Sequence, residues 1–573
     1  MTVVRPSAPP IRVALLLALL LPPPARALAE SGREEVSRVF QKSVPLREGQ
    51  KLSIEHKNGD IRIRTHSAPQ VAIQARIRVS AAKPEEAERF SEAILIEIDE
   101  SAAGVSVRTR YPQERTLWPR SISYSVDYDV GMPETAPLSV RSRFGNIAVT
   151  GLKAPGEIVN GNGKIVFRGG RGRQRLENSF GSVELAGNSG DVAILNNNGS
   201  VSAVDVAGDL DVRDRFGSVA ATRVGGKCVV ANSNGNISLA EVKGETTVTA
   251  SFGKVEVRTA GGNLGVRNSN GAVSVAGVEG RAELATSFGS VSFSDVKRGV
   301  AVAATNSQIT GRRATGDVRV RNTFGAVDLA GIGGATDVEN SNGRIQARDL
   351  RGGAVLKTTF GDVDASGIAG DATVVNANGA ITLSSVEGKA DIRGSFSDAQ
   401  VTRVRKGVRV VSGNGDVTVS DAGGPAYVKT SFGLVDAARI GGTLTVENSN
   451  GAVRAVEGQG PTGVKASFGS VSLEGLGGMV EVDNQNGAVE VRRLTGKGCQ
   501  RVSLKTSFAP IRIALPEGSG YDVTARTSFG KIKSEIPIAA SGAISESALT
   551  GRIGDGGCEL TLTNSNGNIE ITR

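Results

Sequence analysis

The chain of 573 residues contains 75 glycines, 16 phenylalanines, 5 tyrosines and 1 tryptophan, and its formal net charge is +9. Because most of its apolar bulk lies in small residues, a thin and regularly layered core is favoured over a large globular one. The 67 basic residues are interspersed with 58 acidic ones, so the clustered basic stripe of a nucleic-acid-binding protein is not indicated.

Residues 1–29 are predicted to be a signal peptide. Arg5 and Arg12 supply a basic flank, residues 13–21 form the apolar core, and Ala-Leu-Ala at 27–29 is a small-residue cleavage pattern. The apolar run is too short to anchor the chain across a bilayer. We therefore expect a secreted protein of the periplasm, cell surface or medium, with no transmembrane segment after cleavage.

Residues 30–143 are expected to hold one turn of a repeat and an insertion. The motif Asn-Gly-Asp-Ile-Arg-Ile at 58–63 is a copy of the unit that fills the rest of the chain, and Leu138 and Val140 resume its register. Residues 66–134 are therefore predicted to be an insertion that covers the exposed strand edges at the end of the fold. The insertion has strand patterns and one helix pattern that starts at a proline: strands at 71–79, 94–98, 105–108 and 122–130, helix at 84–93.

Residues 144–503 form a strict repeat of twenty 18-residue units. Phenylalanine recurs every 36 residues, at 144, 180, 216, 252, 288, 324, 360, 396, 432 and 468. Asparagine recurs midway between them, at 162, 198, 234, 270, 306, 342, 378, 414, 450 and 486. Glycine follows nearly every one of them, the exceptions being Ser307 and Ser397. The Phe/Asn position is called position zero of the unit.

Each unit predicts two short β-strands. Offsets 3, 5, 8, 12 and 14 are apolar or small, offset 16 is small or polar, and offset 10 is often glycine. Asn-Gly is also a hairpin signal, which would give an antiparallel meander. We favour a solenoid, because position zero holds Phe in half of the units, and a bulky side chain fits a type I′ turn poorly. A solenoid corner needs only a glycine in the left-handed conformation, and the uninterrupted period is typical of stacked turns.

The predicted fold is all-β: a long single-stranded parallel β-solenoid, or β-helix, with one 18-residue unit per rung. A 36-residue rung would enclose more volume than Val and Ala can fill. Twenty rungs at about 4.8 Å give a rod of roughly 95 Å, and parallel connections favour a right-handed coil. The phenylalanines are predicted to fill a core corner, with hydrogen-bonding asparagines between them, so Phe288→Ala is expected to remove about 3–5 kcal/mol of stability.

Residues 504–573 are predicted to be irregular rungs and a cap, because the next Phe/Asn equivalents are Phe508, Phe529 and Asn566. The register places Cys228 at an inward position. Cys499 and Cys558 lie just before the second strands of their rungs, and the rung that ends at Phe529 is expected to lie between them. Two rung steps separate their Cα atoms by roughly 9–10 Å, beyond disulfide reach, so three free thiols are predicted.

The chain resembles a bacterial family of exported β-solenoid repeat proteins named putative adhesins, whose biochemical function is unknown. The resemblance spans about residues 36–573 and rests on the motif at 58–63, Val-Gly-Met-Pro-Glu at 130–134, the repeated Asn-Gly-x-Ile/Val-x-Val, and Asn-Gly-Asn-Ile-Glu-Ile at 566–571. The repeat region of this chain is longer and more regular than the few repeats usual in the family. The resemblance implies a β-solenoid of the cell envelope and supplies no catalytic residues.

An enzyme that acts on polysaccharides is an alternative hypothesis, because some right-handed β-helices cleave them with paired carboxylates. Asp328 and Asp364 share an outward offset two rungs apart, with Gln346 between them, and Asp398 and Asp416 lie on adjacent rungs. We interpret these acids as solvated groups of the rod surface.

Other residues that could carry chemistry are few. Trp118 is the one tryptophan, and it lies in the insertion. His56 and His66 are the two histidines, so a histidine-based triad or metal site is disfavoured, and both are interpreted as structural or surface residues. We therefore predict no enzyme activity, no catalytic, cofactor-binding or metal-binding residues, and no cofactor.

The predicted function is a non-enzymatic scaffold of the bacterial envelope, adhesive or structural, that binds a surface glycan or an envelope protein and no nucleic acid. The alternative is an envelope regulatory or stress-response partner that acts through the insertion. A polysaccharide-acting β-helix enzyme is the third and least favoured hypothesis. The sequence leaves the ligand and the oligomeric state open.

Overall fold

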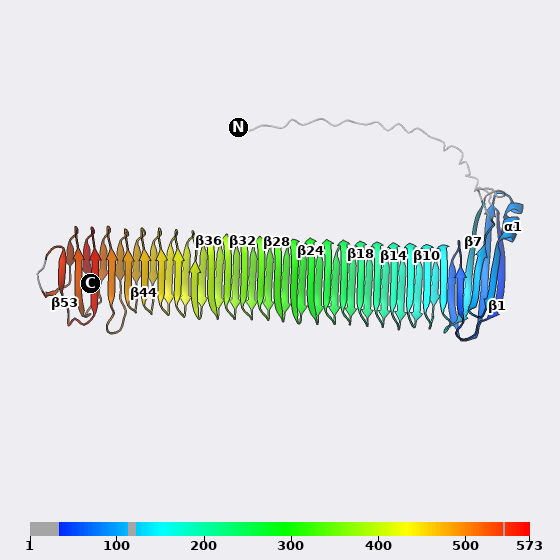
Figure 1. Cartoon of the computed structure of the whole chain (residues 1–573), viewed down its shortest axis with the longest axis horizontal. Helices are drawn as coiled ribbons and strands as arrows, with labels where there is room; N and C mark the ends of the chain where they lie inside the picture. Colours follow the sequence, from blue (N-terminus) through cyan, green and yellow to red (C-terminus); the bar gives the residue numbers. More distant parts are fainter. Residues whose placement is uncertain (1–33, 113–121, 542–544) are drawn as a thin grey trace, which may run out of the picture.

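The computed structural model describes residues 34–112, 122–541 and 545–573, so the expected signal peptide and Trp118 lie outside the described residues. Figure 1 shows a straight rod of stacked strands that ends in a small cap at its N-terminal end. The predicted fold class is confirmed, since the described residues form a parallel β-solenoid of about 21 turns with one short helix. That helix, α1 (Pro84–Ala93), is too short and polar to cross a membrane, and no other described helix could do so.

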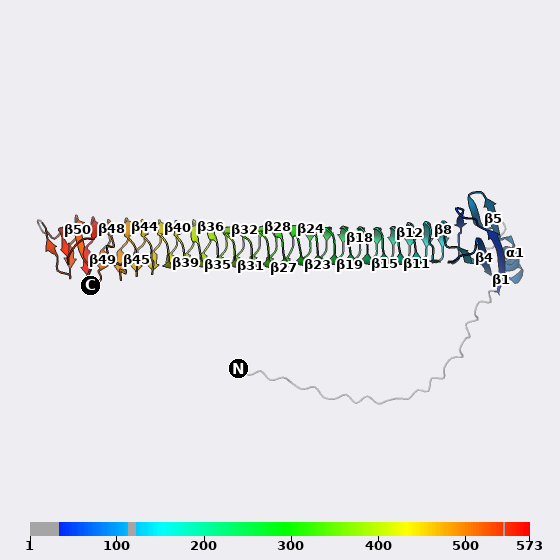
Figure 2. The same cartoon turned by 90° about the horizontal axis from the view of Figure 1, so that it is seen from below.

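Each 18-residue unit contributes one strand to each of two parallel sheets, which face each other in Figure 2. In the middle of the rod, β21 (Val255–Ala260) lies in one sheet and β22 (Leu264–Asn270) in the other. The neighbours of β22 are β20 (Thr246–Phe252) and β24 (Arg281–Phe288), with Phe252 opposite Asn270 and Asn270 opposite Phe288. One unit is therefore one rung, as predicted.

The inward positions of the rung are those predicted from the period. In the unit that begins at Phe252 the buried residues are Val255, Val257, Ala260, Leu264, Val266 and Asn268. Alternating side chains of a strand point to opposite faces, so offsets 3 and 5 of one strand and 12, 14 and 16 of the other fill a single thin layer between the sheets. Cys228 occupies offset 12 and is a buried free thiol.

Buried asparagines at offset 16 tie successive rungs together. Asn268 Nδ2 donates to the carbonyl oxygen of Gly253 at 2.9 Å, and Asn178 Nδ2 donates to the carbonyl oxygens of Gly163 at 3.0 Å and Gly181 at 2.9 Å. A buried amide without partners would be costly, and here it binds corner carbonyls that strand pairing leaves free. The buried hydrogen-bonding asparagine thus lies at offset 16, whereas the sequence interpretation placed it at position zero.

The glycine after position zero allows the rungs to stack closely at this corner. Gly271 has φ +139°, and a Cβ built on it would lie 2.1 Å from the carbonyl oxygen of Gly253 in the preceding rung. No side chain fits there without displacing backbone, and L-residues rarely adopt this φ. The predicted left-handed corner glycine is confirmed.

The first rung is built from β2 (Lys51–Glu55) and β3 (Ile61–His66). These strands pair with β8 (Leu138–Phe144) and β9 (Ile147–Thr150) in the predicted register, with Leu52 opposite Leu138. On their other side they pair with two strands of the insertion, β6 (Gly104–Arg110) and β7 (Ser123–Pro133), which add a further parallel rung.

The end of the rod is covered by antiparallel strands and the helix. β4 (Gln70–Ala81) pairs with β7, β1 (Glu34–Pro45) pairs with β4, and β5 (Leu95–Ser101) pairs with β6. Helix α1, with the predicted bounds, packs on β1 and β4. Arg38 Nη2 donates to the carbonyl oxygens of Ser91 at 2.8 Å and Ile94 at 2.7 Å, which ties β1 to the end of the helix.

At the C-terminal end the stacking order differs from the chain order. β54 (Glu559–Asn564) pairs with β48 (Val502–Thr506) on one side and β50 (Tyr521–Thr527) on the other. β55 (Ile569–Thr572) likewise lies between β49 (Ile511–Ala514) and β51 (Ile532–Ser534). The last rung of the chain is therefore inserted between two earlier ones. β50 is also covered by antiparallel β53 (Ala548–Ile553), on whose far side the short β52 (Ala539–Ala540) pairs.

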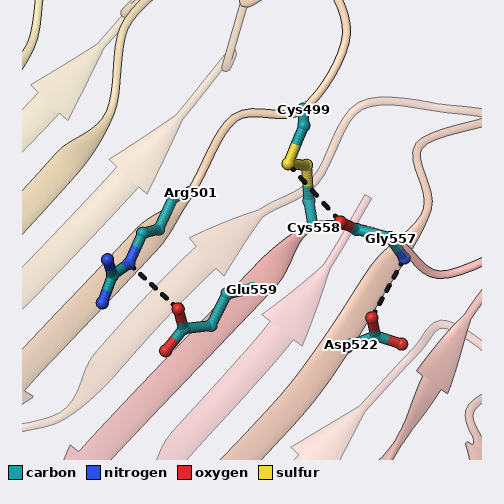
Figure 3. Close-up of a disulfide and its surroundings, with 6 residues drawn as sticks. All are labelled: Cys499, Arg501, Asp522, Gly557, Cys558 and Glu559. Atoms are coloured by element: carbon teal, nitrogen blue, oxygen red, sulfur yellow. Dashed lines mark hydrogen bonds and ion pairs between the residues drawn. A yellow bond between two sulfur atoms is a disulfide. The ribbon is translucent and has the colours of Figure 1, made fainter.

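This insertion corrects the prediction of three free thiols. Cys499 and Cys558 lie on adjacent rungs with their Cα atoms 5.1 Å apart, and they form a disulfide (Figure 3). The ion pair between Arg501 Nε and a carboxylate oxygen of Glu559, 3.0 Å apart, joins the same two rungs. The prediction was wrong because it assumed that the rung of Phe529 separates the two cysteines.

Candidate functional site

The largest exposed apolar feature of the rod is a column of twelve phenylalanines at position zero, which we call the aromatic edge. Eleven of them are between 48 % and 64 % exposed and Phe529 is 84 % exposed. The members are Phe144, Phe180, Phe216, Phe252, Phe288, Phe324, Phe360, Phe396, Phe432, Phe468, Phe508 and Phe529. The prediction that these rings fill a core corner was wrong.

The prediction rested on the tendency of large aromatic side chains to be buried, and the strand alternation does not continue through this corner. In the strand before the corner the buried offsets are even (12, 14 and 16), and in the strand after it they are odd (3 and 5). The phase therefore breaks between offset 16 and offset 3, and position zero lies on the outside of that bend. The asparagines that share position zero in alternate rungs were a sequence signal that this position is exposed. At a core position, their amide groups would each need buried hydrogen-bond partners.

Phe and Asn alternate along the whole edge. The column begins at Asn58, which bridges to Phe144, and each Phe then lies opposite Asn in the next rung. The inserted C-terminal rung preserves the order: Asn566 N donates to the Ser507 carbonyl oxygen, and Phe529 N donates to that of Ser565. Asn566 thus separates Phe508 from Phe529, and the rings recur every second rung, about 9.6 Å apart.

The column at offset 17, directly before position zero, is formed by small or uncharged residues over most of the rod. Arg143 and Arg215 lie in its first part. From there it continues without charge: Ser233, Ser251, Ser269, Ser287, Thr305, Thr323, Ser341, Thr359, Ala377, Ser395, Gly413, Ser431, Ser449, Ser467 and Gln485. A second surface can therefore approach the rings without desolvating charges on this side.

The other edge of the rod has a different character. Offset 7 has positive φ in non-glycine residues such as Asp295 (φ 56°) and Arg313 (φ 52°). Arg313 forms two hydrogen bonds of 2.7 and 2.8 Å with the carboxylate of Asp295 one rung away, and Arg439 bonds to Asp421 in the same way. This column was not predicted from the sequence. Exposed ion pairs of this kind each contribute little stability.

The acids weighed as catalytic groups are engaged in structural contacts. Asp328 pairs with Arg312, and Asp364 accepts from Gln346 Nε2 at 3.2 Å, in the predicted rung order. Asp398 and Asp416 each accept the backbone N–H of the equivalent residue in the next rung, at 2.9 and 2.8 Å. In the described part of the chain no cluster of three or more His, Cys, Asp or Glu residues could hold a metal ion.

His56 is buried in the cap, and His66 ends β3. His56 Nδ1 lies 3.1 Å from Thr109 Oγ1, which lies 2.7 Å from the hydroxyl oxygen of Tyr128. Burial lowers the pKa of His56 to about 4, an effect that nearby Asp127 and backbone groups only partly oppose. The neutral imidazole is thus part of the packed cap, as expected for a structural histidine.

Acidification is predicted to loosen the cap. Between pH 6.5 and about 4, His56 binds a proton in the unfolded chain but not in the folded cap. The stability that is present above pH 6.5 therefore falls as the pH drops through this range, by up to about 3 kcal/mol in total. Hydrogen exchange of β6 and β7 at pH 7 and pH 4.5 measures the effect. His56→Gln is expected to remove most of this pH dependence, and an unchanged dependence in that variant would contradict the assignment.

Asp214 replaces asparagine in the ladder at offset 16, between Asn196 and Asn232. Burial raises the pKa of Asp214 to about 6, although Asn196 and the backbone N–H groups of Arg215 and Phe216 favour the charged form. A raised pKa means that the folded state loses stability as the pH rises from about 4 to 6.

Asp214→Asn is therefore predicted to stabilise the neighbouring rungs by about 2–3 kcal/mol at pH 7.5 and by little at pH 4. Urea unfolding of both chains at the two pH values measures the difference. Asp211→Asn, on the outward side of the same strand, removes only an exposed ion pair with Arg213 and is the control with little expected change. Equal stability of the Asp214→Asn and parent chains at pH 7.5 would refute the prediction.

A second candidate site is a charged depression of about 520 Å³ where the cap joins the rod. It lies over β3, β4 and β7, and its lining includes Asp60, Arg62, Arg76, Asp127 and Asp129. Both signs of charge are present, and Arg62 and Asp129 are within ion-pair distance at 4.0 Å. Such a site suits a polar ligand or a charged segment of a partner.

Comparisons with known proteins add little to the description of this chain. No protein-family model and no curated protein match the chain. A crystal structure named a putative cell adhesion protein, from Clostridium sporogenes, is similar with 8% identity and a TM-score of 0.21, covering 39% of this chain and 99% of that chain. This likeness is too weak to carry an argument, so the relation to the adhesin family stays a prediction.

Proposed function

We propose that this protein is an exported, non-enzymatic scaffold of the bacterial envelope that adheres through its aromatic edge. The exposure of twelve phenylalanines in one straight column carries the proposal. If a Phe side chain has about 200 Å² and half of it is exposed, the rings present about 1,200 Å² of apolar surface. Single exposed apolar residues are normal on soluble proteins, whereas apolar side chains gathered along one edge are typical of interaction sites.

Two features support export and an adhesive role. The disulfide between Cys499 and Cys558 is of a kind that persists in oxidising compartments, in agreement with the expected signal peptide. The rod is about 100 Å long, so a contact that is weak at each ring is repeated many times along one molecule. Repetition of this kind raises the overall affinity without any single strong site.

The test is co-sedimentation of the mature chain with washed envelopes of the producing bacterium. A variant with Phe252, Phe288 and Phe324 replaced by serine is expected to bind at least tenfold more weakly than the parent chain. The matched control replaces Arg223, Arg313 and Arg439 by serine on the other edge and is expected to bind normally. Equal binding by the aromatic-edge variant would overturn the proposal.

A regulatory partner that acts through the cap is the second candidate, favoured by the charged depression over β3, β4 and β7. Arg62→Ala with Asp129→Ala removes charges of both signs from it. Loss of envelope binding in this variant, with normal binding by the aromatic-edge variant, would support the cap as the functional surface. The opposite pattern supports the aromatic edge.

A further inference from the structure

The aromatic edge has the geometry to bind another edge of the same kind. Its rings stand about 9.6 Å apart, with an asparagine rung between them. A second column displaced by one rung would place its rings in these gaps, about 4.8 Å from their neighbours along the axis. Aromatic rings pair at centroid distances of about 4.5–7 Å, so the two columns can interleave.

We propose that the partner of the aromatic edge is a second copy of this chain, bound antiparallel with the two columns of rings interleaved. This inference rests on the proposed function and names the occupant of the binding edge. The rings of a second copy have the same spacing, because the sequence is the same. The two columns can therefore stay in step over the full length of the rod, which Figures 1 and 2 show to be straight.

The antiparallel direction follows from symmetry and from the ends of the column. A two-fold axis along the rod would leave each Phe level with the Phe of the partner, whereas a two-fold axis across the rod reverses the column. The column begins with Asn58 and ends with Phe529. Its reversal therefore places Phe opposite Asn at every level: Phe144 meets Asn566 and Phe252 meets Asn414. A closed two-fold pair of this kind is the commonest protein assembly.

Charges beside the rings agree with this arrangement. A two-fold axis across the rod sets the column at offset 2 against the same column of the partner. In the full overlap, Lys254 faces Asp416, and Asp398 lies one rung away. Arg215 faces Ser449 rather than another arginine. The chain-to-chain contact thus brings opposite charges together at offset 2, and at offset 17 it sets mostly small neutral residues against each other.

The area is sufficient for a stable pair. Complete burial of the rings, about 1,200 Å² on each copy, would give about 2,400 Å² in total, above the 1,200–2,000 Å² of typical stable interfaces. The strand register fixes the spacing of the backbone positions that bear the rings, so no backbone segment has to become ordered on binding.

The test is sedimentation equilibrium of the full mature chain from nanomolar to high micromolar concentration, with small-angle scattering of the associated form. We expect a dimer whose maximum length is close to that of one rod. Phe252→Ser with Phe288→Ser and Phe324→Ser is expected to weaken dimerisation at least tenfold, and amide exchange checks that the rungs remain folded. A chain that stays monomeric, or a dimer unaffected by these substitutions, would overturn the inference.

Orientation is tested by charge. Lys254→Asp is expected to weaken the dimer several-fold by placing it against Asp416, and Asp416→Asn in that background is expected to restore part of the loss. Asparagine keeps an acceptor for the backbone N–H of Leu434. No restoration would contradict the antiparallel register.

Envelopes from a strain without this protein separate the two proposals: if they still bind the aromatic edge, the proposed function stands and pairing with a second copy does not explain it.

Discussion

Phe293→Ala is expected to reduce the free energy of unfolding by about 3–5 kcal/mol, whereas Phe288→Ala, five residues earlier, is expected to reduce it by less than about 1 kcal/mol. Phe293 is 2 % exposed and lies opposite Gly311, and a Cβ at that glycine would come within 2.2 Å of its ring. The ring therefore fills the space that the glycine leaves, and its removal creates a cavity. Phe288 is 54 % exposed.

Hydrogen exchange resolves the two effects along the rod, because in a stacked repeat each rung contacts only its neighbours. Loss of protection is expected around β25 (Val291–Val296) and β27 (Ile309–Ala314) in Phe293→Ala only. If Phe288→Ala were as destabilising as Phe293→Ala, the position-zero rings would have to be core residues, as the sequence interpretation first had them.

Removing the disulfide is expected to destabilise the C-terminal rungs by about 4 kcal/mol, the chain-entropy value for a cross-link that closes a loop of 59 residues. The substitutions Cys499→Ser and Cys558→Ser leave the strand pairing of β48 with β54 intact. They remove the covalent link that restricts the loop between the two cysteines in the unfolded chain. Thermal unfolding of the oxidised, reduced and double-serine chains measures the loss.

The reduced parent chain should behave like the double-serine variant. Cys228→Ala is the control, because the buried thiol of Cys228 is unpaired. Reductant is expected to lower the stability of this variant by the same amount as that of the parent chain. Identical melting of the oxidised and reduced parent chains would show that the inserted rung is held without the cross-link, contrary to this prediction.

The local features of the fold could be predicted because each depends on a few neighbouring residues. The period gave the rung, alternation gave the inward offsets, and the glycine after position zero gave the corner. Pro84 and the acids after it gave the bounds of α1. These signals do not depend on which rung lies beside which.

The stacking order at the C-terminal end depends on pairing between distant segments, and the spacing there is irregular. The alternation of Phe and Asn nevertheless contained the answer: chain order sets Phe508 beside Phe529, and only the insertion of Asn566 restores the pattern. The exposure of the aromatic edge was missed because large aromatic side chains are usually buried, and the strand alternation ends before the corner and does not show which way position zero points.

The most direct test of the architecture is one distance between two sites on the aromatic edge. In a Cys228→Ala chain, Phe252→Cys and Phe432→Cys provide exposed thiols for spin labels, and pulsed electron paramagnetic resonance measures their separation. Ten stacked rungs predict about 48 Å. A 36-residue rung would give about 24 Å, and an antiparallel meander with two strands per unit would give about 96 Å. Ready labelling with a separation near 48 Å is the expected result, and unreactive thiols or either of the other distances would contradict it.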